Sequence, residues 1–332
     1  MKRWMAALAL CLAAVALASA QAKSFNIYTT VEEPLAKELV DQYFKETGIE
    51  VKFQRLAGGE AESRLEAEKA NPQASLWLGG VGLNHMSAKK KGLTAPYVSR
   101  MASNTPAQYR DKENYWIGLY VGPLGFITNT KVAAEQGIKP PQSWADLLKP
   151  EYKGKIRVGN PSLTGTAYNV VTTLRYVFGG DEEKLFDYLK KLDANVDQYT
   201  KSGAAGGKSV AIGEIPIAIG YAHDMVKLKV EGAPVVITIP TEGTGYEVAS
   251  MSLVKNGPDP VNAKKLYDWI LGKTAQEIIG KWYVVPLSKL ATRNPVAFSL
   301  DDVKTVDQDL QWDADNKARL VERWNKEIGS RR

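Results

Sequence analysis

The sequence predicts an α/β protein built as two lobes, and two observations support this prediction. Short apolar strands alternate with amphipathic helices along most of the chain, which is the pattern of a parallel sheet covered by helices. The chain has 332 residues, and beyond roughly 250–300 residues a single hydrophobic core usually divides. We therefore expect two α/β lobes of about 150 residues each, with a hinge between them.

The first residues are typical of a secretory signal peptide. Lys2 and Arg3 precede an apolar run over residues 4–17, and small residues follow at 18–20. The run is shorter than the roughly 20 residues that a membrane-spanning helix needs. We expect cleavage after residue 20, or after residue 22. The only cysteine, Cys11, would leave with this segment. These features predict a periplasmic protein without disulfides that is not embedded in the membrane.

Composition and charge narrow the classes of partner. Apolar residues make up 44% of the chain and charged residues 24%, as in globular proteins. The net charge of +6 becomes +4 without Lys2 and Arg3, and the basic residues are scattered. The run Lys89-Lys90-Lys91 favours a solvated helix end over a nucleic-acid surface, which needs a basic stripe. We expect no nucleic-acid partner, whereas a small anionic ligand is compatible with this charge.

The first part of the mature chain predicts a repeated strand–helix unit. Residues 25–28 form an apolar strand, and the helix over 31–46 ends at Gly48. Thr30 and Glu33 match a T-x-x-E capping box at the start of this helix. The unit then repeats, with strands at 51–54 and 75–78 and helices at 60–70 and 86–91. In such sheets ligands bind at the carboxyl ends of the strands, beside the helix starts.

The middle of the chain predicts a second lobe inserted into the first. An apolar segment at 120–127 contains glycine and proline and is a candidate for a strand that crosses between lobes. The elements that follow are strands at 156–158, 215–221 and 235–239, helices at 165–178 and around 225–228, then a strand at 248–254 and a helix at 261–271. We expect lobe one to comprise 23–120 plus 247–332, lobe two to comprise 121–246, and the crossing strands to lie near 120 and 246.

Seven short motifs are spread over nearly the whole mature chain. They are Ile27-Tyr28-Thr29-Thr30, Ala57-Gly58-Gly59-Glu60, the segment 67–74, the segment 163–167, the segment 202–205, Tyr221-Ala222-His223-Asp224 and the segment 242–247. Their order resembles the periplasmic solute-binding proteins of ABC importers, in the branch of ferric-iron, hexose-phosphate and aminoethylphosphonate binders. The resemblance implies a type II-like fold that closes on a small-molecule ligand and delivers it to a membrane permease. It also implies a monomer with no catalysis, no cofactor and no resident metal.

Several candidate binding residues lie where helices begin. They are Thr29 and Thr30 before the first helix, Gly58, Gly59 and Glu60 at the second, and Thr164, Gly165 and Thr166 at the long helix of lobe two. Helix starts offer free backbone N–H groups and a partial positive charge, which favour phosphate, phosphonate or carboxylate. Ser202 and Gly203 add donors from a glycine-rich loop. Helix capping is the favoured explanation for any one of these sites taken alone. The resemblance implies that the helix starts converge on one cleft, and this convergence favours binding.

A second group of candidates contains acidic and aromatic residues. Tyr221, His223 and Asp224 follow an apolar strand, and Glu242 follows the next strand. Carboxylates accept hydrogen bonds from sugar hydroxyls or a ligand amine, and histidine gives or takes one. In the hexose-phosphate binders a His-Asp pair and a glutamate serve the sugar, so the resemblance assigns that role here. The alternative is that Asp224 caps a helix, His223 packs beside it, and Glu242 is a solvated turn residue.

The two alternative functions are ferric-iron binding and phosphate-ester hydrolysis. Ferric-iron binders of this branch use a histidine in the first loop, a glutamate after the third strand and two adjacent tyrosines. In this chain residues 29–32 hold no histidine, Gly79-Gly80 replaces the glutamate, and only Tyr221 matches because Ala222 follows it. The ligand order is therefore sugar phosphate, then phosphonate, then ferric iron. A periplasmic phosphate-ester hydrolase would use His223 and Asp224 as acid and base, but it lacks a nucleophile and a metal set.

Overall fold

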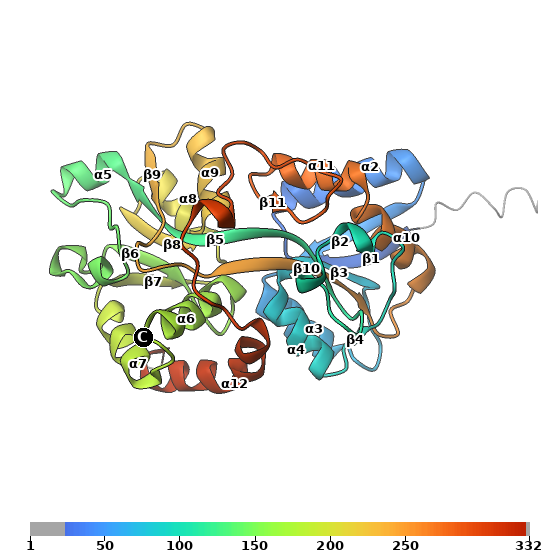
Figure 1. Cartoon of the computed structure of the whole chain (residues 1–332), viewed down its shortest axis with the longest axis horizontal. Helices are drawn as coiled ribbons and strands as arrows, with labels where there is room; N and C mark the ends of the chain where they lie inside the picture. Colours follow the sequence, from blue (N-terminus) through green and yellow to red (C-terminus); the bar gives the residue numbers. More distant parts are fainter. Residues whose placement is uncertain (1–23, 330–332) are drawn as a thin grey trace, which may run out of the picture.

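Two long strands run between the two lobes (Figure 1). Of the hydrophobic core clusters, the two largest lie one in each lobe. The structure is a computed structural model that describes residues 24–329. The predicted signal peptide at 1–20 lies outside the described residues. Among residues 24–329, no helix is both long and apolar enough to cross a bilayer.

The first lobe begins with the predicted strand–helix units. Its elements are β1 (Ser24–Thr29), α2 (Glu33–Thr47), β2 (Glu50–Arg55), α3 (Gly58–Ala67), β3 (Leu76–Val81), α4 (Gly82–Lys90) and β4 (Thr94–Ala95), followed by the short turns η1 (Ala102–Asn104) and η2 (Ala107–Tyr109). Strand β1 pairs in parallel with β2 and with β3. The predicted elements are confirmed, each with bounds shifted by a few residues.

The predicted capping box at the start of α2 is wrong. The N-cap residue of α2 is Glu32, and proline occupies the first turn of the helix. Because the helix starts two residues later than expected, Thr30 stays in the loop that leaves β1. Its Oγ1 accepts a hydrogen bond of 2.9 Å from Nε1 of Trp77. Thr30 is therefore free of a capping role.

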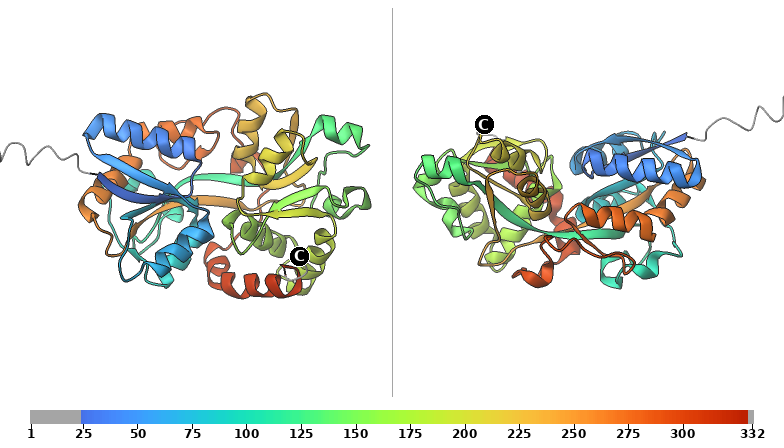
Figure 2. Two further views of the ribbon diagram at one scale, coloured as in Figure 1. Left: turned by 180° about the vertical axis from the view of Figure 1, so that it is seen from behind. Right: turned by 90° about the horizontal axis from the view of Figure 1, so that it is seen from above.

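Strands β5 (Ile117–Asn129) and β10 (Tyr246–Val254) cross between the lobes. They pair with each other in antiparallel orientation, as expected for a chain that leaves one lobe and returns to it. The sheet order is β2-β1-β3-β10-β5-β8-β6-β7, where β8 is Ile217–Tyr221, β6 is Ile156–Gly159 and β7 is Val196–Thr200. The sheet is thus mixed, and the prediction of a parallel sheet holds only for β2-β1-β3 in the first lobe and for β8-β6-β7 in the second. Figure 2 shows both strands running through the junction between the lobes.

The second lobe lies between these two crossings. Its elements are α5 (Thr130–Glu135), η3 (Ala145–Leu148), η4 (Pro150–Tyr152), β6 (Ile156–Gly159), α6 (Gly165–Val177), α7 (Glu182–Asp193), β7 (Val196–Thr200), α8 (Ala205–Ala211), β8 (Ile217–Tyr221), α9 (Ala222–Val230) and β9 (Val235–Thr238). Strand β6 pairs in parallel with β7 and β8, whereas β5 pairs antiparallel with β8 and β9. This arrangement places the starts of α6, α8 and α9 at the ends of parallel strands.

The C-terminal segment is divided between the two lobes. Its elements are α10 (Pro260–Ile270), α11 (Lys273–Lys281), β11 (Val285–Pro286), η5 (Leu300–Asp302) and α12 (Leu310–Glu327). Helices α10 and α11 contribute to the core of the first lobe. Helix α12 instead lies beside α6 (Gly165–Val177) of the second lobe (Figure 1). It buries Leu320 and Trp324 in the core cluster of that lobe, although we expected all of 247–332 in lobe one. The lobe boundaries near 120 and 246 stay a prediction.

Candidate functional site

A cleft of about 820 Å³, its open mouth included, lies between the two lobes. Its walls contain residues at the starts of α3 and α4 in the first lobe and of α6 and α9 in the second. The candidate residues that line it are Thr30, Gly58, Thr164, Gly165, Thr166, Ser202, Gly203, Tyr221, His223 and Asp224. Most candidates from two distant parts of the chain therefore come together in one space.

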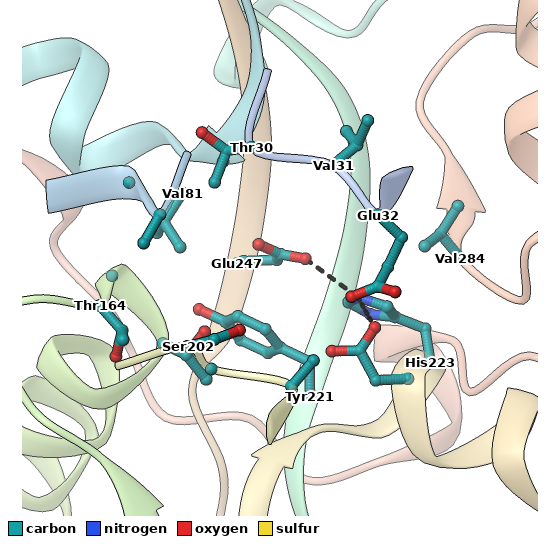
Figure 3. Close-up of a pocket in the computed structure, with 18 of the residues that line it drawn as sticks. Thr30, Val31, Glu32, Val81, Thr164, Ser202, Tyr221, His223, Glu247 and Val284 are labelled. Carbon is teal, nitrogen blue, oxygen red and sulfur yellow. Dashed lines mark ion pairs between the residues drawn. The ribbon is translucent and has the colours of Figure 1, made fainter. Parts of the chain in front are cut away.

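Figure 3 shows that the cleft has two chemically different ends. Thr30, Thr164 and Ser202 lie on one side, while Glu32 and His223 lie on the other, with Glu247 and Tyr221 between them. The first end, with Thr30, Thr164 and Ser202, offers hydroxyls and helix starts, and we call it the amide end. The second end offers carboxylates and an imidazole, and we call it the acidic end. It comprises Glu32, His223, Asp224 and Glu247.

At the amide end, the start of α6 is capped by its own threonine. The Oγ1 atom of Thr164 accepts a hydrogen bond of 3.1 Å from the backbone N–H of Ala167. Thr164 therefore caps the helix and also lines the cleft, and its role in ligand binding stays a prediction. The backbone N–H groups of the first turn, at Gly165 and Thr166, lie at the cleft wall and are the groups that a helix start leaves without an intrahelical partner.

Three candidate residues near this end have structural roles outside the cleft lining. Thr29 is buried, and its Oγ1 donates to the carbonyl of Leu78 over 3.1 Å. Glu60 accepts a 3.3 Å hydrogen bond from the backbone N–H of Ala57 and so caps α3. A Cβ on Gly59 would lie 2.9 Å from the carbonyl oxygen of Leu163, so this glycine permits close approach of the two lobes.

At the acidic end, His223 contacts two carboxylates. Its Nε2 lies 3.3 Å from Oε1 of Glu247 and 3.7 Å from Oδ1 of Asp224. Its ring stacks on Tyr221, with 5.6 Å between the ring centroids. Tyr221 is held in turn by a 2.9 Å hydrogen bond that its Oη accepts from Nδ2 of Asn169. The imidazole is thus fixed between a tyrosine and an acidic pair.

The glutamates that line the cleft are Glu32 and Glu247, and not Glu242, which the sequence analysis selected. Both carboxylate oxygens of Glu242 accept hydrogen bonds of 3.1 Å, from the backbone N–H groups of Trp144 and Ala145. Glu242 holds the start of η3 and is absent from the cleft lining. Glu247 was missed because it lies inside a strand. The position of the predicted crossing near residue 246 is the signal that could have found it.

Burial determines the protonation of the acidic end. It raises the pKa of the Glu247 carboxyl well above its usual value, and nearby Asp224 raises it further. Burial also raises the pKa of Asp224 and lowers the pKa of His223. Glu32 at the same end has cationic neighbours, because Nζ of Lys208 lies 3.1 Å and Nη2 of Arg55 lies 3.9 Å from its carboxylate. Of the described residues, His223 is the basic side chain that contacts the Asp224 and Glu247 carboxyls, and donor groups of a ligand would add hydrogen bonds to them.

A metal site requires several ligand side chains close together. Within residues 24–329, no three His, Cys, Asp or Glu side chains are placed to hold a metal ion. Tyr120 and Tyr221 add phenol oxygens to the cleft wall, and burial raises the pKa of both hydroxyls well above its ordinary value. Both phenols therefore keep their protons at neutral pH.

The comparisons with known proteins agree with this two-lobed geometry. Residues 84–314 match the model of the family described as bacterial extracellular solute-binding protein. An uncharacterised protein of Haemophilus influenzae is 34% identical over 93% of this chain and 92% of its own length. A putative 2-aminoethylphosphonate-binding periplasmic protein of Salmonella typhi is 30% identical over 71% of this chain and 68% of its own length.

A solved structure is similar over nearly the full described chain. The periplasmic binding protein AfuA from Actinobacillus pleuropneumoniae, with fructose-6-phosphate bound, is 33% identical, and the match covers 92% of this chain and 99% of that chain with a TM-score of 0.89. The fold and the family are those of substrate-binding proteins, which are not enzymes. By sequence and by structure, the chain belongs to the family of bacterial extracellular solute-binding proteins.

Proposed function

We propose that this protein is the periplasmic receptor of an ABC importer and that it captures a small organic phosphate or phosphonate, with a sugar phosphate as the first choice. The observation that carries the proposal is the division of the cleft into an amide end and an acidic end. The similarity to a protein with fructose-6-phosphate bound and to a putative 2-aminoethylphosphonate-binding protein supports the same class of ligand.

The amide end suits the anionic group of such a ligand. The starts of α3 and α6 face the cleft from different lobes, and helix starts favour phosphate groups through free N–H donors and the helix dipole. Thr30 and Ser202 add side-chain hydroxyls. An oxyanion between these helix starts contacts both lobes at once, so its binding favours the closed form.

The acidic end suits the uncharged or cationic part of the ligand. A bare oxyanion such as sulfate would offer Asp224 and Glu247 no donor from the ligand and would add negative charge close to them. Sugar hydroxyls or an amine donate hydrogen bonds to these carboxyls. A ligand with a phosphate or phosphonate at one end and donor groups at the other satisfies both ends.

Transport follows from closure around the ligand. We propose that β5 and β10 act as the hinge, that the closed form docks on a membrane permease, and that the predicted signal peptide directs export. Lys208 of α8 and Glu32 before α2 form an ion pair between the two lobes with an N–O distance of 3.1 Å. Pairs near the surface contribute about 0–1 kcal/mol, so this pair alone adds little to the preference for closure.

Ferric iron is the second candidate, because Tyr120, Tyr221 and Glu247 all bring oxygen atoms to the cleft. Ferric sites need several hard anionic oxygens. Burial raises the pKa of all three groups, so binding iron would require the release of protons from them. This cost favours the organic phosphate over iron.

Isothermal titration calorimetry tests the proposal. The mature protein is titrated with fructose 6-phosphate, glucose 6-phosphate, 2-aminoethylphosphonate, sulfate and ferric citrate. We expect at least one phosphorylated or phosphonate ligand to bind with a Kd in the micromolar range or tighter, roughly 8 kcal/mol of binding free energy, and sulfate and iron to bind far more weakly. Binding of iron alone would overturn the proposal. Release of inorganic phosphate from the esters would instead favour a hydrolase.

A matched pair of variants ties the binding to the acidic end. Asp224→Asn keeps the shape of the side chain but changes an acceptor oxygen into a donor. We expect it to weaken sugar-phosphate binding at least about tenfold, the effect of roughly 1.4 kcal/mol, while the melting temperature stays equal or rises. A fall in melting temperature with unchanged affinity would make Asp224 a structural residue.

A further inference from the structure

We infer that Asn84 contacts the ligand as a hydrogen-bond donor at the amide end, and that Lys317 of α12 is the positioning residue that aims it. This inference rests on the proposed function in one respect, that the ligand carries an oxyanion. Neither residue was a sequence candidate. Asn84 lies in the first turn of α4, is fully buried, and lines the cleft.

The orientation of the Asn84 amide follows from its contact with Lys317. Nζ of Lys317 lies 2.7 Å from Oδ1 of Asn84. An ammonium group only donates hydrogen bonds, so the amide oxygen must face the lysine and Nδ2 must point the opposite way. Nδ2 is buried and has no hydrogen-bond partner within residues 24–329. A buried donor without an acceptor is unfavourable, and an incoming acceptor removes this penalty.

The unpartnered nitrogen lies between helix starts of the two lobes. A Cβ on Gly58, the first residue of α3, would collide with Nδ2 of Asn84, and a Cβ on Gly165, the first residue of α6, would lie 3.3 Å from it. Glycine at both positions therefore leaves room beside the amide. The N–H donors of α3, α6 and Asn84 meet at one place, which is where an oxyanion finds donors from both lobes.

Lys317 is itself held in place. Its Nζ lies 2.7 Å from Oε2 of Glu62, a buried carboxylate that also accepts a hydrogen bond from Ser87 and lies 3.1 Å from Nζ of Lys91. These contacts fix the ammonium beside the amide, and its charge strengthens the donor capacity of Nδ2. Because α12 packs in the core of the second lobe, the orientation of the Asn84 amide in the first lobe depends on a helix of the second lobe.

The first test replaces the donor. Asn84→Asp keeps an oxygen for Lys317 but turns a carboxylate oxygen toward the oxyanion. With fructose 6-phosphate as the calorimetric probe, we expect affinity to fall at least about 100-fold at pH 7.5 while the melting temperature does not fall. The loss should shrink at pH 5.5, where the phosphate ester, with a second pKa of about 6, carries less charge. Affinity within twofold of the parent at both pH values would overturn the inference.

The second test separates positioning from general stability. We expect Lys317→Met to weaken binding about tenfold, Lys317→Arg to restore it to within about threefold, and Lys317→Met to have no further effect in an Asn84→Ala background. Equal losses from Lys317→Met in both backgrounds would overturn the positioning role. If the parent protein binds none of fructose 6-phosphate, glucose 6-phosphate and 2-aminoethylphosphonate, the proposed function fails and the inference fails with it. If the parent binds and the Asn84 variants bind equally well, only the inference fails.

Discussion

The backbone of Gly122 in β5 and the imidazole of His223 in α9 are in such close contact that a Cβ atom on residue 122 would lie 2.5 Å from Nδ1 of His223. The missing side chain in a crossing strand therefore sets the position of the ring at the acidic end. The Nδ1 atom is buried without a hydrogen-bond partner within the described residues. Packing, rather than a hydrogen bond on that nitrogen, holds the imidazole toward Asp224 and Glu247.

We expect Gly122→Ala to displace the His223 ring. The added methyl group overfills a buried site, so the free energy of unfolding should fall by about 1–3 kcal/mol. Affinity for the sugar phosphate should fall at least about tenfold, because the ring can no longer contact both carboxylates. Thermal denaturation and calorimetric titration measure the two effects.

Gly207→Ala is the matched control for this substitution. Gly207 lies in α8, where a Cβ would meet only the side chain of Leu228 at 3.5 Å, an ordinary contact. Alanine in a helix is favoured over glycine by about 0.5–1 kcal/mol, so stability should rise slightly and affinity should stay unchanged. Equal losses in both variants would mean that any added methyl group disturbs the lobe.

The elements were predictable because local signals specify them. Helix α6 was expected at 165–178 and spans Gly165–Val177, since Thr164 caps its start and Gly179 follows its end with a φ of 63°. The crossing strand at 120–127 was likewise predictable, because the segment is apolar and does not show the periodicity of an amphipathic helix. Such signals depend only on residues that are close together in the chain, so they can be recognised before the fold is known.

The acidic end was predictable only in part, because it is assembled across the chain. His223 and Asp224 follow a strand directly and so carry a local signal. Glu247 lies beside them only because β10 returns between the lobes. The sequence analysis selected Glu242 instead, because of the pattern around that residue. Asn84 and Lys317 lie 233 positions apart. No spacing rule connects such residues before the fold is known.

The two glutamates make a direct comparison possible. We expect Glu247→Gln to raise the melting temperature at pH 7.5 by about 2–4 °C and to weaken ligand binding at least about tenfold. Burial raises the pKa of Glu247 above its usual value, so the folded protein holds this proton more tightly than the unfolded chain does. Stability contributed by this group is therefore lost as pH rises through the folded pKa, and glutamine removes that loss.

Glu242→Gln should act in the opposite way. Its carboxylate holds two backbone N–H groups at η3, and glutamine retains only one acceptor oxygen. We expect a loss of about 1 kcal/mol in the free energy of unfolding and a Kd within about twofold of the parent. If Glu242→Gln weakens binding and Glu247→Gln does not, the glutamate selected from the sequence is the functional one after all.

Asp313 of α12 predicts a pH dependence of stability. Burial raises the pKa of its carboxyl to about 6, from an ordinary value of 3.8, although Tyr176 and Gln308 donate hydrogen bonds to it. The folded state therefore binds the proton more tightly, and stability from this group is present below pH 3.8 and is lost as pH rises to 6. The difference corresponds to about 3 kcal/mol.

Urea denaturation of the parent and of Asp313→Asn isolates this effect. The other buried carboxyls titrate in both proteins, so the difference between the two unfolding free energies reports residue 313. Between pH 4 and pH 7.5 we expect the parent to lose up to about 3 kcal/mol relative to the variant. Parallel curves across this range would show that Asp313 has an ordinary pKa in the folded protein.

Trp282 provides an optical measure of binding. Within residues 24–329 it is the tryptophan that lines the cleft, and Nζ of Lys227 lies 4.5 Å from its ring centroid. Closure on a ligand changes the polarity around this indole, so intrinsic fluorescence should change on addition of fructose 6-phosphate. Trp282→Phe should remove most of the change and alter affinity by less than about fivefold, since a partly exposed cation–π contact contributes only about 0.5–1 kcal/mol.

Trp269→Phe is the matched control. Trp269 of α10 is not among the residues that line the cleft, and its Nε1 donates to Glu46, so this variant should keep the full change. A signal that survives in Trp282→Phe and disappears in Trp269→Phe would mean that the ligand binds outside the cleft between the lobes.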